Sequence, residues 1–267
     1  MLYLRDDLKK AWQGQDPQQL LENMDGEVYR ALEARRTFRF ELNGKGFFAK
    51  VHGGVGWFEI FENYIRLRKP VLGARHEWEA LNKLHDIGID TMTPVGFGET
   101  GRNPAAQRSF LVTEELKDMV TLEDFCKPWK TTPPPFRLRL AIVVKLAEIS
   151  KKMHGNGINH RDYYLCHFMM PDLSKPDPDN LMFYMIDLHR AQLREITPLR
   201  WVIKDLSGLY YSAMDIGITR KDIFRFIKIY TGLSLREAFT QHLSMWRAIE
   251  EKANKLYQRM ERKAGRL

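Results

Sequence analysis

His160, Arg161 and Asp162 begin a segment, HRDYYLCHFMM, whose residue types and spacing suit phosphoryl transfer. A loop Asp can accept or orient the proton of the attacking hydroxyl group, and an Asn five residues later commonly holds a metal ion. The fifth residue here is His167. A neutral imidazole offers a lone pair, although Mg²⁺ prefers oxygen and imidazole suits softer ions such as Mn²⁺. We therefore expect His167 to bind metal, Mn²⁺ to be tolerated and activity to fall at acidic pH. The alternative is that His167 only packs beneath the loop.

Three further charged residues would complete such a site. Lys50, in GFFAKV, follows apolar residues as a phosphate-neutralising strand Lys does. Glu77 and Glu79 are candidates to hold this Lys, and Glu77 is favoured because small or apolar residues follow it at helical spacing. Asp187 follows five apolar residues, MFYMI, and a carboxylate there could bind Mg²⁺.

The parts that would hold a nucleotide are less complete. We expect adenine to bind backbone groups of the connection at 113–116, which includes Glu114 and Leu116. The turn between the first two strands, LEARRTF, lacks the glycines that let a backbone wrap phosphates. Arg35 and Arg36, expected at the tip of this turn, could supply positive charge instead.

The first part of the chain predicts a small antiparallel sheet with one helix. Residues 1–23 are expected to form a helical extension. Strands are expected at 28–32, 37–42 and 47–52, with two more in TPVGFGE and SFLVTEEL. Asn43-Gly44 predicts a two-residue hairpin, because both turn positions need positive φ. The helix in GARHEWEALNKLHDIGI should end near Gly88.

The remainder predicts a mainly helical region. A helix should begin with Thr132 as N-cap and Pro133 as its first residue, and should end at Gly155 and Gly157. Its apolar stripe has helical spacing and comprises Leu138, Ile142, Leu146, Ile149 and Met153. LMFYMID predicts a buried strand. Two later helices should open with capping boxes, Thr219–Asp222 and Ser234–Glu237.

Composition excludes several classes of protein. The chain has 267 residues, of which 44% are hydrophobic and 28% charged, which is typical of a folded globular protein. No apolar run approaches the roughly 18–20 residues that span a bilayer. We expect no secretory signal, because MLYLRDDLKKAWQGQD holds acidic residues and no apolar segment. The two cysteines, Cys126 and Cys166, favour a reduced, cytoplasmic setting.

The net charge of +8 lies in the last third of the chain. Residues 190–267 hold 16 Lys and Arg against 8 Asp and Glu, whereas residues 1–189 hold 26 of each. Such a surface attracts anionic partners, or simply aids solubility. Nucleic acid is disfavoured because no aromatic platform or nucleic-acid motif accompanies the charge.

The HRDYYLCHFMM segment, the sequence DLHR after a buried strand and the later KDLSGLYYSA together resemble one specific family. These are the lipopolysaccharide core heptose kinases of Gram-negative bacteria, in particular the kinase of the first inner-core heptose. The resemblance covers residues 25–255 approximately. It implies an α+β, protein-kinase-like, two-lobed fold. The extension and small lobe would occupy 1–115, and the helical large lobe, with its basic C-terminal helices, 116–267.

The resemblance also implies a reaction and residue roles. It implies transfer of phosphate from ATP, with Mg²⁺, to a heptose hydroxyl, expected to be the 4-hydroxyl, at the cytoplasmic face of the inner membrane. Asp162 would be the base, Lys50 the phosphate-binding Lys and Asp187 a metal ligand. Asp205 would brace the catalytic-loop backbone. The basic last third could bind the acidic acceptor, an anionic membrane or a small acidic protein. Lys252, Lys255, Arg259, Arg262 and Lys263 recur there at helical spacing.

Two other interpretations stay open. The acceptor could be another small molecule or a protein Tyr or Ser. The chain could also be a catalytically silent, nucleotide-binding scaffold, which the missing glycines and His167 favour. The retained Lys50, Glu77, Asp162 and Asp187 argue against a silent scaffold, because such a protein needs none of them for catalysis.

Overall fold

The structure is a computed structural model that describes the whole chain except residues 33–34, 55, 66–72, 264 and 266–267. Its contacts divide it into two compact units, each described here by itself. Unit 1 comprises residues 1–83, 92–116 and 188–190, and unit 2 comprises 84–91, 117–187 and 191–267. Most of the range expected for the small lobe thus lies in unit 1, and most of the large lobe in unit 2.

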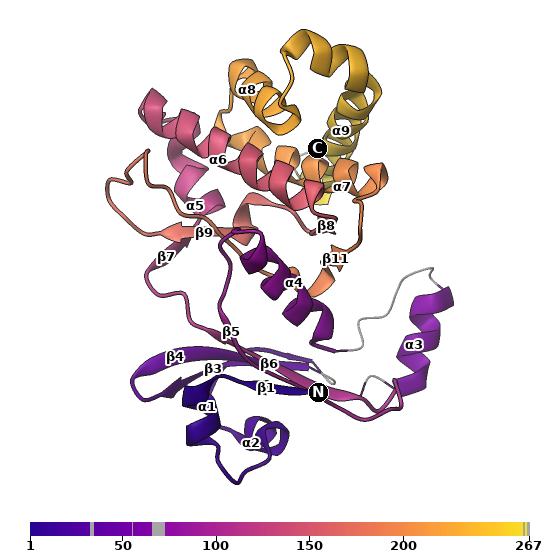
Figure 1. The fold of residues 1–267 in the computed structure, drawn as a ribbon. Helices are drawn as coiled ribbons and strands as arrows, with labels where there is room; N and C mark the ends of the chain where they lie inside the picture. The colour runs from indigo at the N-terminus through magenta and orange to yellow at the C-terminus, as the bar shows by residue number, and fades with distance from the viewer. Residues whose placement is uncertain (33–34, 55, 66–72, 264, 266–267) are drawn as a thin grey trace. The chain divides into compact units, whose positions relative to one another are not determined.

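Unit 1 is built on a six-stranded antiparallel sheet with the strand order β1-β5-β6-β4-β3-β2 (Figure 1). The strands are β1 (Leu2–Leu4), β2 (Glu27–Leu32), β3 (Arg35–Leu42), β4 (Lys45–His52), β5 (Pro94–Thr100) and β6 (Arg108–Glu114). Asn43 and Gly44 join β3 to β4 with φ of 52° and 73°, which confirms the predicted hairpin.

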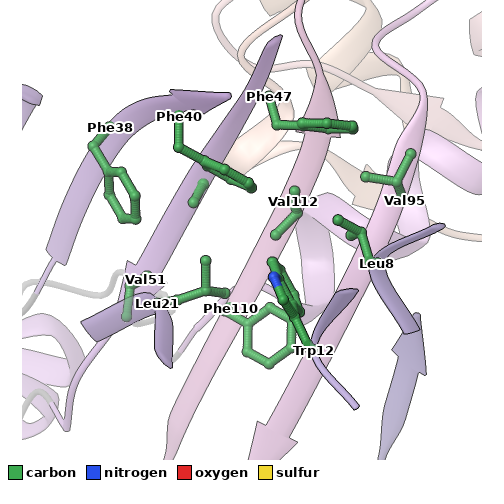
Figure 2. Close-up of a cluster of buried hydrophobic side chains, with 11 residues drawn as sticks. Leu8, Trp12, Leu21, Phe38, Phe40, Phe47, Val51, Val95, Phe110 and Val112 are labelled. Atoms are coloured by element: carbon green, nitrogen blue, oxygen red, sulfur yellow. The ribbon is translucent and has the colours of Figure 1, made fainter. Parts of the chain in front are cut away.

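One face of this sheet is covered by α1 (Asp6–Ala11) and α2 (Pro17–Asn23), as Figure 1 shows. Their apolar side chains form one buried cluster with those of the strands (Figure 2). The cluster comprises Leu8, Trp12, Leu21, Phe38, Phe40, Phe47, Ala49, Val51, Val95, Phe110 and Val112.

The expectation that residues 1–23 are wholly helical was wrong at their start, because Leu2–Leu4 pairs with the edge of β5.

Two more helices belong to this part of the chain. In α4 (Arg75–Asp86), Trp78 stacks on Phe97 of β5 at 5.2 Å, so its early residues lie on the sheet face opposite α1 and α2. It ends two residues before Gly88, whose φ is 63°, as predicted. The helix α3 (Gly56–Ile65) was not predicted, so the expectation of a sheet with only one helix was wrong.

Unit 2 is mainly helical. Its helices are α5 (Leu122–Cys126), α6 (Phe136–Gly155), α7 (Leu199–Ala213), α8 (Arg220–Thr231) and α9 (Leu235–Lys263). Short strands and single 3-10 turns connect them. These are β7 (Met119–Thr121), β8 (Ile158–Asn159), β9 (Phe168–Pro171), β10 (Tyr184–Met185), β11 (Gln192–Leu193) and the turns Lys127–Lys130, Leu165–His167 and Met214–Ile216. A further turn, Leu188–Arg190, belongs to unit 1. Only Tyr184–Met185 of the predicted buried strand in LMFYMID forms a strand, which is β10.

The start of α6 corrects the predicted N-cap. The helix begins at Phe136 after Pro135, rather than at Pro133 after Thr132. A proline disfavours helical dihedrals in the residue before it, so the successive prolines 134 and 135 disfavour a helix that includes Pro133 and Pro134. All five residues of the predicted apolar stripe are buried, and the helix ends at Gly155 as expected.

The last three helices pack on a common apolar cluster. Its buried members are Val202, Leu206, Ile227, Ala238, Met245, Trp246 and Ile249. Both predicted capping boxes are present, at Thr219–Asp222 and Ser234–Glu237. Within the described residues, none of the helices combines the length and apolar character needed to cross a bilayer.

Candidate active site

Lys50 and Glu77 form a buried ion pair in unit 1. The Nζ atom of Lys50 lies 2.5 Å from Oε1 of Glu77, and the two side chains are 17% and 2% exposed. Glu79 instead lies 3.8 Å from Arg75 at the surface. Glu77 is therefore the partner of Lys50, and it fixes the ammonium group above β4. That the ammonium binds nucleotide phosphate stays a prediction.

His52 lies on the same face of the sheet as Lys50, because residues two apart in a strand share a face. It pairs across the strands with Arg35. Burial, together with the charges of Arg35 and Lys50, lowers the pKa of His52 to about 4. Neither Nε2 of His52 nor Nε of Arg35 has a hydrogen-bond partner among the described residues. The sequence interpretation missed His52, although its spacing from Lys50 could have indicated it.

Contrary to expectation, Arg35 and Arg36 do not lie together at the tip of a turn. Both belong to β3, and the turn residues 33–34 lie outside the described residues. Because neighbouring strand residues face opposite ways, Arg36 points towards α2 and donates hydrogen bonds to the carbonyls of Glu22 and Met24. Arg35 is thus the better placed of the two to meet a phosphate beside Lys50. Phosphate binding by either arginine stays a prediction.

The connection after β6 uses its acidic side chains within unit 1. Glu114 contacts Arg5 at 2.7 Å, and Glu115 binds Arg39 through two hydrogen bonds of 2.6 and 2.9 Å. The amide of Glu114 donates to the carbonyl of Thr93. A role of Glu114 or Leu116 in holding adenine would therefore use main-chain atoms, and it stays a prediction.

The HRD loop in unit 2 is held by a buried carboxylate. Oδ2 of Asp205 accepts from the amide of His160 at 2.7 Å, and Oδ1 accepts from the amide of Arg161 at 2.8 Å. Asp205 is fully buried in α7, and Lys204 donates to the carbonyl of Arg161. These bonds hold Arg161 in the left-handed region, at a φ of 75°. The expected brace of the catalytic-loop backbone is thus confirmed, and it fixes the position of Asp162.

His160 ties this loop to the segment that ends in Asp187. Its Nε2–H donates to the carbonyl of Ile186 at 3.0 Å. The side chain is completely buried, and burial lowers the pKa of His160, which keeps the ring neutral. Its ring stacks on that of His167, with centroids 5.6 Å apart. His160 therefore has a positioning role, between Asp162 and Asp187.

His167 presents one ring nitrogen to Asp187. A carbonyl oxygen can only accept, so the 2.6 Å contact between Nδ1 and the carbonyl of Asp162 places the ring proton on Nδ1. The lone pair is then on Nε2, which lies 3.6 Å from Oδ2 of Asp187. Asp187 has a φ of 60°, a left-handed conformation that turns the chain sharply after β10.

His167 and Asp187 suit a shared Mg²⁺ or Mn²⁺. Neighbouring ligands of an octahedral Mg²⁺ lie roughly 3 Å apart, close to the spacing of these two atoms. Within the part of the chain that the structure describes, no three His, Cys, Asp or Glu residues gather as a metal site. Two protein ligands are nevertheless usual where phosphates complete the shell of Mg²⁺. Metal binding by this pair stays a prediction.

Two neighbouring residues have no catalytic position. His154 contacts the hydroxyl of Tyr230 at 3.0 Å and is buried beside Asp205, so it has a structural position. Cys166 is half-buried, and burial, with Glu123 nearby, raises the pKa of its thiol to about 11. It is therefore a poor nucleophile.

Comparison with known proteins shows the family. Residues 19–230 match the model of the lipopolysaccharide kinase (Kdo/WaaP) family. The lipopolysaccharide core heptose(I) kinase WaaP of Pseudomonas aeruginosa is 47% identical over 98% of this chain and 97% of its own length. The Escherichia coli (strain K12) kinase of the same name is 44% identical over 98% and 99%. A solved structure of WaaP in complex with acyl carrier protein is 44% identical, covers 96% of this chain and 99% of its own, and superposes with a TM-score of 0.85. The chain therefore belongs to the lipopolysaccharide kinase (Kdo/WaaP) family, has a protein-kinase-like fold and is a kinase.

Proposed function

We propose that this kinase transfers the terminal phosphate of ATP, with Mg²⁺, to the 4-hydroxyl of the first heptose of the lipopolysaccharide inner core. The relatives named as core heptose(I) kinases support the acceptor. The observation that supports the proposal is the loop held by Asp205, in which the main-chain carbonyl of Asp162 contacts His167, and His167 in turn contacts Asp187. This arrangement suits an attack by an alcohol on a nucleotide phosphate.

Each residue then has a defined task. Asp162 orients the acceptor hydroxyl and accepts its proton as the new ester bond forms. Lys50, fixed by Glu77, holds phosphate oxygens of ATP. His167 and Asp187 hold the metal ion, which when bound neutralises charge on the phosphates. The main chain at 113–116 holds adenine.

A transfer assay tests the proposal. Labelled ATP is supplied with purified inner-core acceptor that lacks the heptose phosphate, and the product is located by NMR. Wild type should phosphorylate the 4-hydroxyl, and Asp162→Ala should lose at least about 100-fold in kcat while still binding ATP. Silence of both proteins with intact ATP binding would favour the scaffold interpretation. Transfer only to another small molecule or to a protein would contradict the acceptor.

We also propose a small acidic protein as a partner of the basic end of unit 2. The solved relative in complex with acyl carrier protein supports this. The five basic residues singled out in α9, from Lys252 to Lys263, are all exposed. Replacing all five by Gln should weaken binding of acyl carrier protein, most at low salt, because exposed charges are screened at high ionic strength. Binding that is unchanged at low ionic strength would exclude this surface.

An apolar cavity in unit 2 is a candidate for a further contact with this partner. It has a volume of about 430 Å³ and is lined by residues that include Trp129, Ile142, Leu209, Phe226 and Trp246. We propose that it accepts the acyl chain that such a carrier bears. The acylated carrier should then bind more tightly than the unacylated one, as calorimetry can measure, and equal affinities would exclude the cavity.

A membrane contact of α3 is proposed as well. Phe58 is 84% exposed and Ile65 82%, and Trp57 and Phe61 are also exposed. Aromatic and aliphatic side chains on an exposed helix suit the bilayer interface, where a lipid-linked acceptor would lie. Phe58→Ser with Ile65→Ser should reduce sedimentation with anionic vesicles several-fold. Unchanged sedimentation would exclude α3 from membrane contact.

A further inference from the structure

Three arginines of unit 2 surround one indole ring beside the HRD loop. The guanidinium carbons of Arg161, Arg194 and Arg200 lie 5.2, 5.9 and 5.5 Å from the ring centroid of Trp201. No two of these carbons can therefore be more than about 11 Å apart. Like charges this close raise the local positive potential, because the separation is near the Debye length of about 8–10 Å. We call these four residues the arginine cluster.

The backbone holds Arg194 in place. It directly follows β11, which pairs with β8, and its amide donates to the carbonyl of Gly157 at 2.9 Å. Its two Nη atoms donate to the amide oxygens of Asn159 and Gln192 at 2.5 and 2.6 Å. These neutral partners fix the guanidinium group but do not compensate its charge.

The charges of Arg194 and Arg200 lack a counterion among the described residues of unit 2. Among the described residues, no carboxylate lies within 4 Å of either guanidinium group. Burial and the charge of Arg200 lower the pKa of Arg194, so the pair repels itself. Elsewhere arginines of this chain meet carboxylates, as Arg39 meets Glu115 and Arg75 meets Glu99. Arg194 and Arg200 therefore form a cationic pair that no described carboxylate neutralises, and an acidic ligand could do so.

The start of α7 adds to this potential. The helix begins at Leu199 after Pro198, so Arg200 and Trp201 stand in its first turn, where the helix dipole favours anions. Arg200 is exposed and Arg194 is partly exposed, so a ligand can reach both. A guanidinium group forms paired hydrogen bonds with carboxylate and phosphate oxygens. The ligand chemistry that fits is therefore an acidic oxygen group.

We propose that the arginine cluster binds an acidic group of the acceptor, a carboxylate or a phosphate ester, and so orients the acceptor at the active site. This inference rests on the proposed function. Arg161 directly precedes Asp162, and its main chain is fixed by Asp205 and Lys204. The fixed main chain of Arg161 therefore links the cluster to Asp162, the residue proposed to receive the hydroxyl proton. The cluster selects acceptors that carry negative charge close to the reacting sugar.

The first test is kinetic. Arg194→Gln and Arg200→Gln are compared with wild type on deacylated inner-core oligosaccharide and on a synthetic heptoside without acidic groups. Each change should raise the KM for the acidic acceptor about tenfold, as expected for a lost charge-assisted hydrogen bond, with kcat and the KM for ATP unchanged. On the neutral heptoside the variants should match wild type. Arg137→Gln, which removes an exposed arginine paired with Asp179, is the control and should change nothing. An unchanged KM for the acidic acceptor would overturn the proposal.

The second test separates this inference from the proposed function. Calorimetry measures binding of the acidic oligosaccharide to Asp162→Asn, alone and combined with Arg194→Gln, without any turnover. If Asp162→Asn binds the oligosaccharide about tenfold more tightly than the double variant, the arginine cluster binds the acceptor, even if no heptose is phosphorylated. Equal affinity overturns the cluster even if wild type is an active heptose kinase.

The acidic group could instead be a phosphate on the chain itself. Wild type and Arg200→Gln are therefore assayed after treatment with phosphatase and after incubation with ATP. The difference in acceptor KM between the two proteins should survive phosphatase treatment. Its disappearance would assign the cluster to a phosphorylated residue of the chain and overturn its assignment to the acceptor.

Discussion

Replacing Asp205 by Asn should lower both the stability of the protein and its kcat, although Asp205 acts only through the backbone of the HRD loop. The carboxylate is completely buried, and its two oxygens accept the amides of His160 and Arg161 at 2.7 and 2.8 Å. An Asn side chain keeps one acceptor oxygen and turns an NH₂ group towards the other amide. One charge-assisted hydrogen bond, worth about 1.5–3 kcal/mol, is lost, and one buried amide is left without a partner. We expect a loss of about 3 kcal/mol in the free energy of unfolding.

The loss of this bond should also release the loop that carries Asp162. A displacement of roughly 1 Å at a reacting group can cost about 100-fold in rate, so kcat should fall on this order while the KM for ATP changes little. Urea unfolding followed by tryptophan fluorescence and single-turnover phosphate transfer measure the two effects. Asp215→Asn is the control, because Asp215 is exposed and accepts a hydrogen bond from the hydroxyl of Tyr257 at 2.9 Å. A variant with wild-type kcat would refute the view that Asp205 positions the loop.

Three further expectations concern the other site residues. Lys50→Met should lower the free energy of unfolding in urea by about 3–5 kcal/mol, because it leaves buried Glu77 unpaired. Adding Glu77→Leu should restore most of this stability, whereas Glu79→Gln alone should change it little. Equal stability of Lys50→Met and of the double variant would contradict a buried pair. Burial lowers the pKa of His52 from 6.5 to about 4, so on acidification the unfolded chain protonates this residue before the folded chain does. The contribution of His52 to the free energy of unfolding is therefore complete above pH 6.5 and is lost as the pH falls towards 4. This contribution is on the order of 3 kcal/mol. His52→Leu should flatten the dependence of the unfolding free energy on pH in this range. Parallel curves for wild type and His52→Leu would show that His52 is not the cause. His167→Asn should keep substantial activity with Mg²⁺ and lose its tolerance of Mn²⁺ several-fold in initial rates, whereas identical rates with every metal would exclude His167 as a ligand.

The local structural elements were predictable where short-range chemistry alone decides them. The hairpin at Asn43-Gly44, the apolar stripe of α6 and both capping boxes follow from short-range rules of dihedral angle and spacing. The choice of Glu77 over Glu79 followed from helical periodicity, and the ion pair with Lys50 agrees with it.

Other features depended on contacts between distant segments. Leu2–Leu4 forms a strand because the edge of β5 is available to it, which no local pattern reveals. The opposite directions of Arg35 and Arg36 became clear only once the bounds of β3 were known. The start of α6 at Phe136 could have been predicted, since consecutive prolines exclude helical dihedrals before them.

The sequence by itself predicts which groups could do the chemistry: an Asp for the hydroxyl proton, a Lys for phosphate, and a His and an Asp for metal. Their order along the chain and the family they resemble followed from residue type and spacing. Only the tertiary structure decided how these groups are oriented, because orientation depends on bonds between residues far apart in sequence. Asp205 fixes the HRD loop from 44 and 45 residues away, and the Asp162 carbonyl sets the ring proton of His167 so that Nε2 faces Asp187. The arginine cluster around Trp201 has the same origin, since β11 and α7 bring its members to one ring.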